Sequence, residues 1–330
     1  MTKQAQLGTH GPQVFPIALG CMGMGAGSWY GKTDDAESVA TIHSALERGV
    51  NLIDTGDFYG MGHNELLVGT ALRGRRDQAL LSVKYGAQLG PDGSFLGVDT
   101  SPNATKTALT YSLTRLGVDH IDIYRPARLD PRVPIEETIG AIAELVQAGY
   151  VRFIALSEVG ADTIARATKV HPIVDLQIEY SLITRGPEAT VMPALKTAGA
   201  AMTAYGVFSR GLLTGSKPQG NDLRANMPRF AQADKNAPLV EALAKLALKR
   251  GVSSAQLALA WVRAKGESLG VTVVPTIGAR TRKQIHDVLD GADVALSSGE
   301  LAELEAAVPA SEVAGTRDHA EIMAHLDSER

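Results

Sequence analysis

The chain has 330 residues, of which 45% are hydrophobic and 21% are charged, and its formal net charge is −4. This composition is typical of a globular protein and excludes a disordered or fibrous one. Because only 5% of the residues are aromatic and no long basic run occurs, we expect a protein that handles small molecules and does not bind nucleic acid.

Residues 4–16, with a turn at His10 and Gly11, are predicted to form a hairpin that closes the bottom of the fold. Short runs of Val, Ile and Leu then alternate with longer amphipathic segments. These runs are typical of buried parallel strands, because they lack the polar alternation of half-exposed strands. They are Ile17–Leu19, Val50–Ile53, Ala79–Val83, Ile121–Tyr124, Arg152–Leu156, Val174–Ile178, Ala200–Ala204 and Val271–Val274.

Capping patterns mark helix starts between these runs. Ser101 followed by Pro102 predicts a helix through Leu116. Eight strands separated by helices predict an α/β fold, a closed (β/α)₈ TIM barrel that forms a single domain over residues 1–330. Capping-box spacing occurs at Asp34 with Glu37, Ser253 with Gln256, Thr281 with Gln284, and Ser297 with Glu300.

Two segments exceed what eight β/α units need. Gly206–Lys235 is rich in Gly, Pro, Asn and Ser and is predicted to be a long loop on the top face, after the seventh strand. Residues 309–330 form a polar C-terminal extension that we do not expect to cover any particular element.

In a barrel of this kind, the side chains at the carboxyl ends of the strands surround one mouth, where active sites lie. Polar or ionisable groups follow the apolar runs at these ends and therefore predict a site there. They are Asp54 with Tyr59, Lys84, Arg125 with Arg128, Ser157 with Glu158, Gln177 with Glu179, Tyr205 and residues 275–278.

Tyr59, Lys84 and Asp54 suggest acid catalysis. A phenol has a pKa of about 10, and a nearby ammonium lowers this pKa toward neutrality while a carboxylate holds the ammonium in place. Tyr59 is then able to protonate a carbonyl oxygen as hydride reaches the carbonyl carbon. The alternative is a structural ion pair between Asp54 and Lys84, with Tyr59 packed at the rim.

The segment after the last strand predicts an anion site. Gly278 allows close backbone approach, and Arg280, Arg282 and Lys283 surround the start of the next helix. Barrels often bind phosphate after strands seven and eight, and these cations suit a phosphomonoester on a ribose. The alternative is an exposed basic helix start.

Residues 26–33, AGSWYGKT, match a loosened phosphate-loop pattern. Trp29 and Tyr30 are bulky where such a loop needs bare backbone, so we interpret the segment as a wall of a substrate pocket at the top face. Arg125 and Arg128 are further candidates for that pocket.

Cys21 is the only cysteine, which excludes an intramolecular disulfide and favours a reducing, cytoplasmic location. The N-terminal segment lacks the apolar core of a secretory signal, and no run of about 18 apolar residues follows. We therefore expect no membrane partner. The histidines show no HxH or HExxH pairing, and no metal site is predicted.

The segment GVNLIDTGDFYGMGHNELLVGTAL resembles the aldo-keto reductase superfamily, whose members read DTAxxYG followed by NExxxG at this place. The resemblance continues through LLSVKYG, IDIYRPARLDP, LQIEYSLITR, AYGVFSRGLLTG and VPTIGARTRKQI, over roughly residues 14–305. It implies a barrel that binds NADPH across its top face and reduces a small-molecule aldehyde or ketone. Asp54, Tyr59 and Lys84 would be three members of the catalytic tetrad, with Tyr59 as general acid.

The resemblance also implies a set of cofactor contacts. Ser157 and Gln177 would hold the nicotinamide carboxamide, Asp54 would lie beside them, and Tyr205 would stack on the ring. The pyrophosphate would lie against Gly206, Val207, Phe208, Ser209, Arg210, Gly211 and Leu212. The adenosine and its 2′-phosphate would contact Gly278, Arg280, Gln284 and Asp287.

Three positions depart from the family pattern. Relatives read YQHRxDP after the fourth strand where this chain reads RPARLDP, so Ala127 replaces the histidine that is the tetrad's fourth member. Glu158 stands where an asparagine usually recognises the carboxamide, and we retain it as an expected cofactor contact. Val288 stands where an asparagine is common near the adenine.

Loss of the histidine removes a donor to the substrate carbonyl, which can cost about 10²-fold or more in rate. Arg125, Arg128 or a water beside Ala127 is a candidate replacement. The first interpretation is an NADPH-dependent reductase of aldehydes or ketones. One alternative is a barrel that binds NADPH with weak or no catalysis and acts as a redox-sensing or partner-binding module. Another is an unusual substrate or the oxidative direction.

Overall fold

The computed structural model describes residues 2–25, 30–31, 33–218 and 222–329. Within this part of the chain, eight strands form a closed barrel in which neighbours pair in parallel. Each overlaps its predicted run, so the predicted (β/α)₈ barrel is confirmed. The strands are β3 (Ala18–Gly20), β4 (Leu52–Gly56), β5 (Leu80–Tyr85), β8 (Ile121–Pro126), β9 (Val151–Ser157), β10 (Ile173–Glu179), β11 (Ala201–Tyr205) and β12 (Val273–Gly278).

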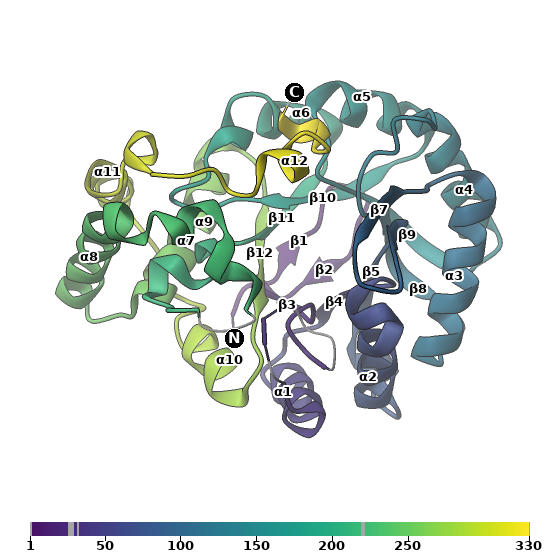
Figure 1. Cartoon of the computed structure of the whole chain (residues 1–330), viewed down its shortest axis with the longest axis horizontal. Helices are drawn as coiled ribbons and strands as arrows, with labels where there is room; N and C mark the ends of the chain where they lie inside the picture. The colour runs from purple at the N-terminus through teal and green to yellow at the C-terminus, as the bar shows by residue number, and fades with distance from the viewer. Residues whose placement is uncertain (1, 26–29, 32, 219–221, 330) are drawn as a thin grey trace.

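Helices surround the barrel (Figure 1). Those that follow the strands are α1 (Asp35–Glu47), α2 (His63–Leu72), α3 (Pro102–Leu116), α4 (Ile135–Gln147), α5 (Ala161–Val170), α6 (Val191–Ala198), α9 (Ser254–Leu269) and α10 (Arg282–Leu289). Further helices are α7 (Pro228–Ala231), α8 (Ala233–Arg250), α11 (Ser298–Ala307) and α12 (Ala320–Met323).

The predicted caps are largely confirmed. Helix α3 has the predicted bounds, and both halves of the capping box are present at Ser253 and at Ser297. Thr281 caps α10, but the Gln284 side chain accepts a hydrogen bond from the backbone of Arg280 instead of from the cap residue. Side-chain to backbone hydrogen bonds therefore fix the starts of these helices, α3, α9, α10 and α11.

The N-terminal hairpin closes the barrel bottom, as predicted. Strands β1 (Ala5–Gln6) and β2 (Gln13–Val14) pair antiparallel. Leu7 and Val14 are fully buried in an apolar cluster with residues from the barrel strands, among them Ile123 and Val174. The bottom is thus filled by side chains, which leaves the opposite, carboxyl-terminal face for a site.

Two top-face segments differ from the prediction. An unpredicted antiparallel hairpin, β6 (Ala87–Leu89) with β7 (Phe95–Val98), follows β5. Residues 206–235 were predicted to be one long loop, but they contain the short helices η4 (Ser209–Thr214) and η5 (Leu223–Asn226), then α7 and the start of α8. Asp222 caps η5 and Pro228 occupies the first turn of α7, and these local signals explain where the two helices begin. Residues 219–221 lie outside the described residues.

The C-terminal extension crosses the molecule from α11 toward α5 and α6, as the yellow segment in Figure 1 shows. It contains η6 (Ala310–Glu312), α12 and η7 (Asp327–Glu329). The prediction that it covers no particular element is wrong. Asp327 accepts hydrogen bonds from the backbone of Gly160 and from Thr163 at the start of α5, and Asn236 of α8 exchanges hydrogen bonds with the backbone of Ala314. These partners are distant in sequence and leave no local pattern.

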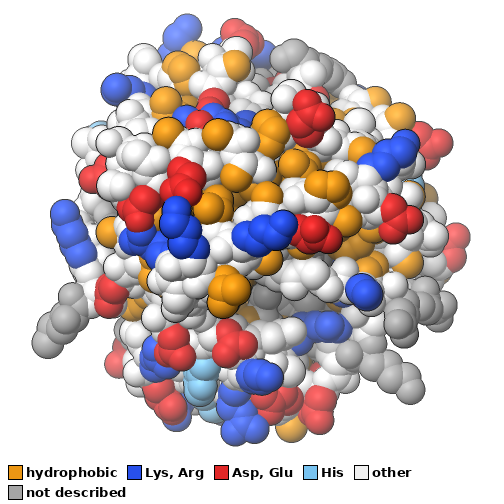
Figure 2. Space-filling model, turned by 90° about the vertical axis from the view of Figure 1, so that its left-hand side faces the viewer, with side chains coloured by type: hydrophobic (Ala, Val, Ile, Leu, Met, Phe, Trp, Pro, Cys, Tyr) orange, Lys and Arg blue, Asp and Glu red, His pale blue; other side chains and the backbone are white. Residues whose placement is uncertain are grey.

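On the side that carries α8 and α11, basic and acidic side chains are interspersed among apolar ones (Figure 2). Lys249 of α8 pairs with Glu303 of α11 at 2.9 Å, and Arg250 pairs with Glu300. Within the described residues, no helix is both long and apolar enough to cross a bilayer.

Candidate active site

The structure brings Asp54 and Lys84 together at the mouth of the barrel. Strands β4 and β5 pair with Asp54 opposite Ser82 and Gly56 opposite Lys84, so the two side chains emerge from neighbouring strands. Lys84 Nζ forms an ion pair with Asp54 Oδ1, while Oδ2 accepts hydrogen bonds from Ser82 Oγ at 2.8 Å and Gln177 Nε2 at 3.0 Å. Both charged groups are buried.

Tyr59 lies beside this pair. It begins the short helix η1 (Tyr59–Gly62) directly after β4, and Lys84 Nζ lies 5.5 Å from the centre of its ring. Burial and the charge of Asp54 raise the pKa of Tyr59. The expectation of a lowered pKa is therefore wrong for the cofactor-free protein, because the loss of water around the phenol outweighs the nearby cations.

Lys84 is affected by burial as well. Burial lowers the pKa of its ammonium, and the ion pair with Asp54 opposes that decrease. The guanidinium charges of Arg125 and Arg128 also lower this pKa. The predicted three residues thus form one buried, electrostatically coupled group.

The fourth position of the expected tetrad holds Ala127, which is buried just after β8. Its neighbour Arg128 donates to the Ala127 carbonyl at 2.6 Å. The charge of Arg128 acts on Tyr59, where it opposes the rise of the phenol's pKa, and also on Glu158 and Tyr205. Arg128 therefore lies among the predicted site residues.

Arg125 points into the barrel instead. Its guanidinium is fully buried and forms a two-point ion pair with Asp175 at 2.8 and 3.2 Å. It also donates to Thr203 Oγ at 3.3 Å and to Ser82 Oγ at 3.0 Å. With no accessible surface, Arg125 does not line a substrate pocket, contrary to the prediction for this residue.

Ser157, Glu158 and Gln177 lie at the ends of the adjoining strands β9 and β10, where Gln177 pairs opposite Ser157. Ser157 Oγ is buried and has no hydrogen-bond partner within the described residues. Glu158 has a positive φ of 54° and is fully buried. It forms an ion pair with Arg317 of the C-terminal extension at 2.6 Å and accepts a hydrogen bond from Tyr205 Oη at 2.7 Å.

The loop after β11 also carries strained backbone. Ser209 and Arg210 have φ values of 46° and 55°, in the region that favours glycine. Arg210 donates to Tyr30 Oη at 3.3 Å and pairs with Asp318 at 3.2 Å. Tyr30 thus contacts the loop expected to hold the pyrophosphate. Trp29 lies outside the described residues.

At the predicted anion site after β12, one of the expected cations is already paired with a carboxylate of the protein. Arg282 pairs with Glu37 of α1 at 2.9 Å, so its charge is balanced within the protein. Arg280 donates to the Tyr30 carbonyl at 2.7 Å and lies beside Gly23. Gly278, Gln284 and Asp287 are exposed at the same edge of the barrel.

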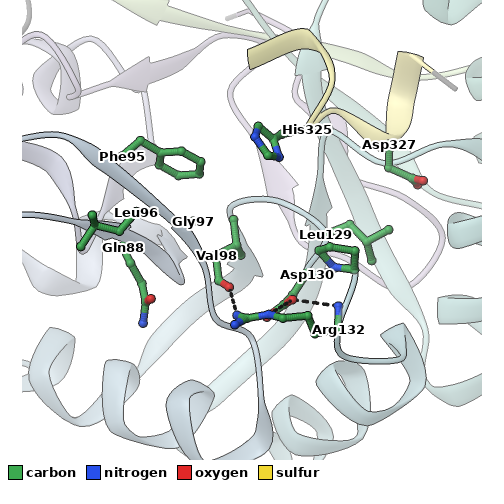
Figure 3. Close-up of a pocket in the computed structure, with 11 residues that line it drawn as sticks. Gln88, Phe95, Leu96, Gly97, Val98, Leu129, Asp130, Arg132, His325 and Asp327 are labelled. Carbon is green, nitrogen blue, oxygen red and sulfur yellow. Dashed lines mark hydrogen bonds and ion pairs between the residues drawn. The ribbon is translucent and has the colours of Figure 1, made fainter. Parts of the chain in front are cut away.

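A pocket of about 270 Å³ opens between the β6–β7 hairpin, the segment after β8 and the C-terminal extension (Figure 3). Phe95 and His325 meet edge to face across it, with ring centres 6.0 Å apart. Leu129 and Val98 add apolar lining, and Arg132 pairs with Asp130. Asp54, Tyr59 and Lys84 do not line this pocket.

Nothing in the sequence singles out Arg317 and Asp318. A charged pair in a polar tail resembles any exposed terminus, and only its side-chain partners reveal the role. The sequence does not predict the positive φ of Glu158 either, because glutamate is not enriched in that conformation.

Comparison with known proteins gives concordant results. The sequence model described as "Aldo/keto reductase family" matches residues 16–309. The chain is 38% identical to a Glycine max protein described as "Probable aldo-keto reductase 1", over 96% of this chain and 91% of that protein. A glycerol dehydrogenase of Gluconobacter oxydans superposes with a TM-score of 0.81 at 29% identity, over 93% and 95% of the two chains. An aldo-keto reductase of Bacillus halodurans in its holo form superposes with a TM-score of 0.78 at 28% identity, over 94% and 97%.

Proposed function

Because the chain belongs to the aldo/keto reductase family, we propose that it reduces an aldehyde or a ketone to an alcohol with NADPH, with Tyr59 as the proton donor. Members of this family are oxidoreductases that use nicotinamide cofactors. The observation that carries the proposal is the buried ion pair between Asp54 and Lys84 beside the ring of Tyr59.

The bound cofactor supplies hydride to the carbonyl carbon. As negative charge develops on the carbonyl oxygen, the Tyr59 hydroxyl donates the proton that completes the alcohol. Burial raises the pKa of Tyr59, so the phenol is protonated at neutral pH and able to act as an acid. The Lys84 ammonium stabilises the phenolate left after transfer, and Asp54 holds that ammonium in place.

Two features fit a nicotinamide cofactor. The buried Oγ of Ser157, which has no partner in the part of the chain that the structure describes, is available to a carboxamide. Arg280 places a cation along the same edge, and Arg210, whose guanidinium also pairs with Asp318, has a buried Nε without a partner within the described residues. The position of Arg280 favours NADPH over NADH, because its guanidinium would face the 2′-phosphate that NADPH carries and NADH lacks.

Arg128 is our candidate for the donor that the replaced histidine would supply. Its charge already acts on Tyr59 and Lys84, whereas Arg125 is enclosed by Asp175. A guanidinium offers several N–H donors, so it is able to hold a carbonyl oxygen while Tyr59 donates its proton.

The pocket of Figure 3 is our candidate for the part of the substrate remote from the carbonyl. Its lining by Phe95, Leu129 and Val98 favours an apolar group there.

Stopped-flow mixing of NADPH-loaded protein with a panel of aldehydes, ketones and pyridoxal tests the proposal. The wild type should oxidise NADPH with at least one compound, and Tyr59→Phe should slow this step about 10²–10⁴-fold without weakening NADPH binding. Tyr111→Phe, on the exposed face of α3, is the matched control and should leave the rate unchanged. A wild type that binds NADPH but oxidises it with none of the compounds would instead support the redox-sensing or partner-binding alternative.

A further inference from the structure

The C-terminal strap, defined as residues 313–329, reaches the predicted nicotinamide end of the site. We propose that Arg317 of this strap is a positioning residue, which holds the ring of Tyr205 in place through the carboxylate of Glu158. The inference rests on the proposed function in so far as Tyr205 faces the nicotinamide. It assigns a role to a segment outside the eight β/α units.

Glu158 is the centre of this arrangement. Arg317 Nη1 donates to Glu158 Oε1 at 3.0 Å and Nη2 donates to Oε2 at 2.6 Å. Oε1 also accepts from Tyr205 Oη at 2.7 Å and from the backbone of Glu179 at 3.0 Å, and Oε2 accepts from Ser328 Oγ at 2.8 Å. Five donors from the protein therefore surround this carboxylate, which leaves it little capacity to bind a carboxamide, contrary to our expectation for this position.

The buried negative charge of Glu158 is balanced by the positive charge of Arg317 from the strap. Burial alone would raise the pKa of Glu158, but the hydrogen bonds and the charge of Arg317 hold it at about 2. Glu158 is fully buried and only 5% of the Arg317 side chain is exposed. A buried carboxylate that remains ionised requires such a partner, and its hydrogen bonds to neighbours are strong.

Tyr205 connects the pair to the site. It ends strand β11, and its hydroxyl donates to Glu158 Oε1. The same hydroxyl oxygen accepts a longer hydrogen bond, of 3.4 Å, from Arg317 Nη1. An aromatic ring held at its hydroxyl by a fixed anion has little freedom to tilt. A ring that stacks on a cofactor then presents one flat surface, which lowers the entropy lost on binding.

The strap is fixed on both sides of Arg317. On one side, Ala314 exchanges two hydrogen bonds with Asn236, at 2.9 and 3.0 Å. On the other, Asp318 pairs with Arg210, and Asp327 accepts from the backbone of Gly160 at 2.8 Å. His325 and Asp327 of the strap border the pocket of Figure 3. These anchors determine where the guanidinium of Arg317 can lie.

Hydrogen exchange of the cofactor-free protein tests the contact directly. In Arg317→Ala, backbone amides of residues 313–329 and of the end of β11 should exchange faster than in the wild type. Glu321→Ala, an exposed substitution in the same strap, is the matched control and should leave the end of β11 unchanged. Unchanged exchange at β11 in Arg317→Ala would overturn the inference.

Cofactor titration tests the consequence. Arg317→Ala should raise the Kd for NADPH about tenfold, because a hydrogen bond to a charged group is lost. Arg317→Lys should restore part of the affinity. Tyr205→Phe should weaken binding less, and adding it to Arg317→Ala should cause no further loss, since both act through one chain of contacts.

Additive effects of the two substitutions would contradict the inference. If Arg317→Ala does not fold, Ser328→Ala replaces it, because it removes one hydrogen bond to Glu158 and leaves the ion pair intact. It should also speed exchange at the end of β11, by a smaller amount, and no change there would overturn the inference. A wild type that binds no NADPH contradicts the proposed function, whereas the exchange experiment still decides whether Arg317 holds Tyr205.

Discussion

Backbone strain marks the site at the scale of single residues. Within the described part of the chain, the non-glycine residues with positive φ are Met61, Glu158, Ser209 and Arg210. Each follows a barrel strand by a few residues, and such conformations cost about 1–3 kcal/mol each. They persist because their surroundings hold them, as the Arg317 ion pair holds Glu158. Three of these four residues, Glu158, Ser209 and Arg210, stand where cofactor contacts are expected.

Arg280 is expected to decide the choice of cofactor. Arg280 is half-buried beside Gly23 and donates to the Tyr30 carbonyl, a neutral acceptor that leaves the charge of the guanidinium for a 2′-phosphate. Arg280→Ala should weaken NADPH binding at least about tenfold and NADH binding much less, as measured by titration with each cofactor. Arg73→Ala, an exposed change on another face, should leave the ratio unchanged. Equal weakening of both cofactors would count against the 2′-phosphate role.

Asp57 should make stability depend on pH. Burial and the nearby charge of Glu65 raise its pKa to about 7. The folded protein holds this proton more tightly than the unfolded chain does. The contribution of protonated Asp57 to the free energy of unfolding is therefore fully present below about pH 4 and is lost as the pH rises through about 7.

Urea unfolding at about pH 5 and about pH 8 measures this effect. Asp57→Asn should lose less stability between the two pH values than the wild type does. Asp77→Asn, at an exposed position, should behave like the wild type. Identical losses in Asp57→Asn and the wild type would show that Asp57 does not carry the proton.

At the scale of elements, the two ends of the barrel differ in how they are filled. The bottom is closed by a short hairpin whose apolar side chains enter the core. The top is covered by the β6–β7 hairpin, the helical segment after β11 and the C-terminal strap. The strap forms ion pairs with the segment after β11 and with Glu158 after β9, and Val98 of the hairpin accepts a hydrogen bond from Arg132 after β8. Polar contacts of this kind suit a face that must admit a cofactor and a substrate.

Leu7→Ala should destabilise the whole barrel, because Leu7 is fully buried at the bottom. The free energy of unfolding should fall by about 2–5 kcal/mol, as for other large-to-small changes in a core. Urea denaturation measures this change. Leu248→Ala, on the exposed face of α8, should change stability by only about 0.5 kcal/mol or less. Equal effects of the two substitutions would contradict a packed hairpin.

At the scale of the whole molecule, a polar chain runs through the barrel interior to the site. Asp175 pairs with Arg125, Arg125 donates to Ser82, and Ser82 donates to Asp54. All four side chains are buried. The interior therefore supports the orientation of Asp54 from below, while Lys84 holds it from the mouth.

Asp175→Asn should leave the charge of Arg125 buried without its partner and cost about 3–5 kcal/mol of stability. Adding Arg125→Met should recover part of this loss, since the uncompensated charge disappears. A double-mutant cycle in urea measures the coupling. If the two changes are simply additive, the pair contributes no coupled interaction.

The sequence by itself determined the features that depend on neighbouring residues: the eight apolar strands, most helix caps and the position of Asp54, Tyr59 and Lys84 at strand ends. Only the tertiary structure decided the inward direction of Arg125, the raised pKa of Tyr59 and the pairing of Glu158 with Arg317. These depend on burial and on partners up to 159 positions apart along the chain. A periodic pattern in the sequence predicts which face of a helix or strand a residue occupies. The state of a buried charge depends instead on the partners that distant segments bring to it.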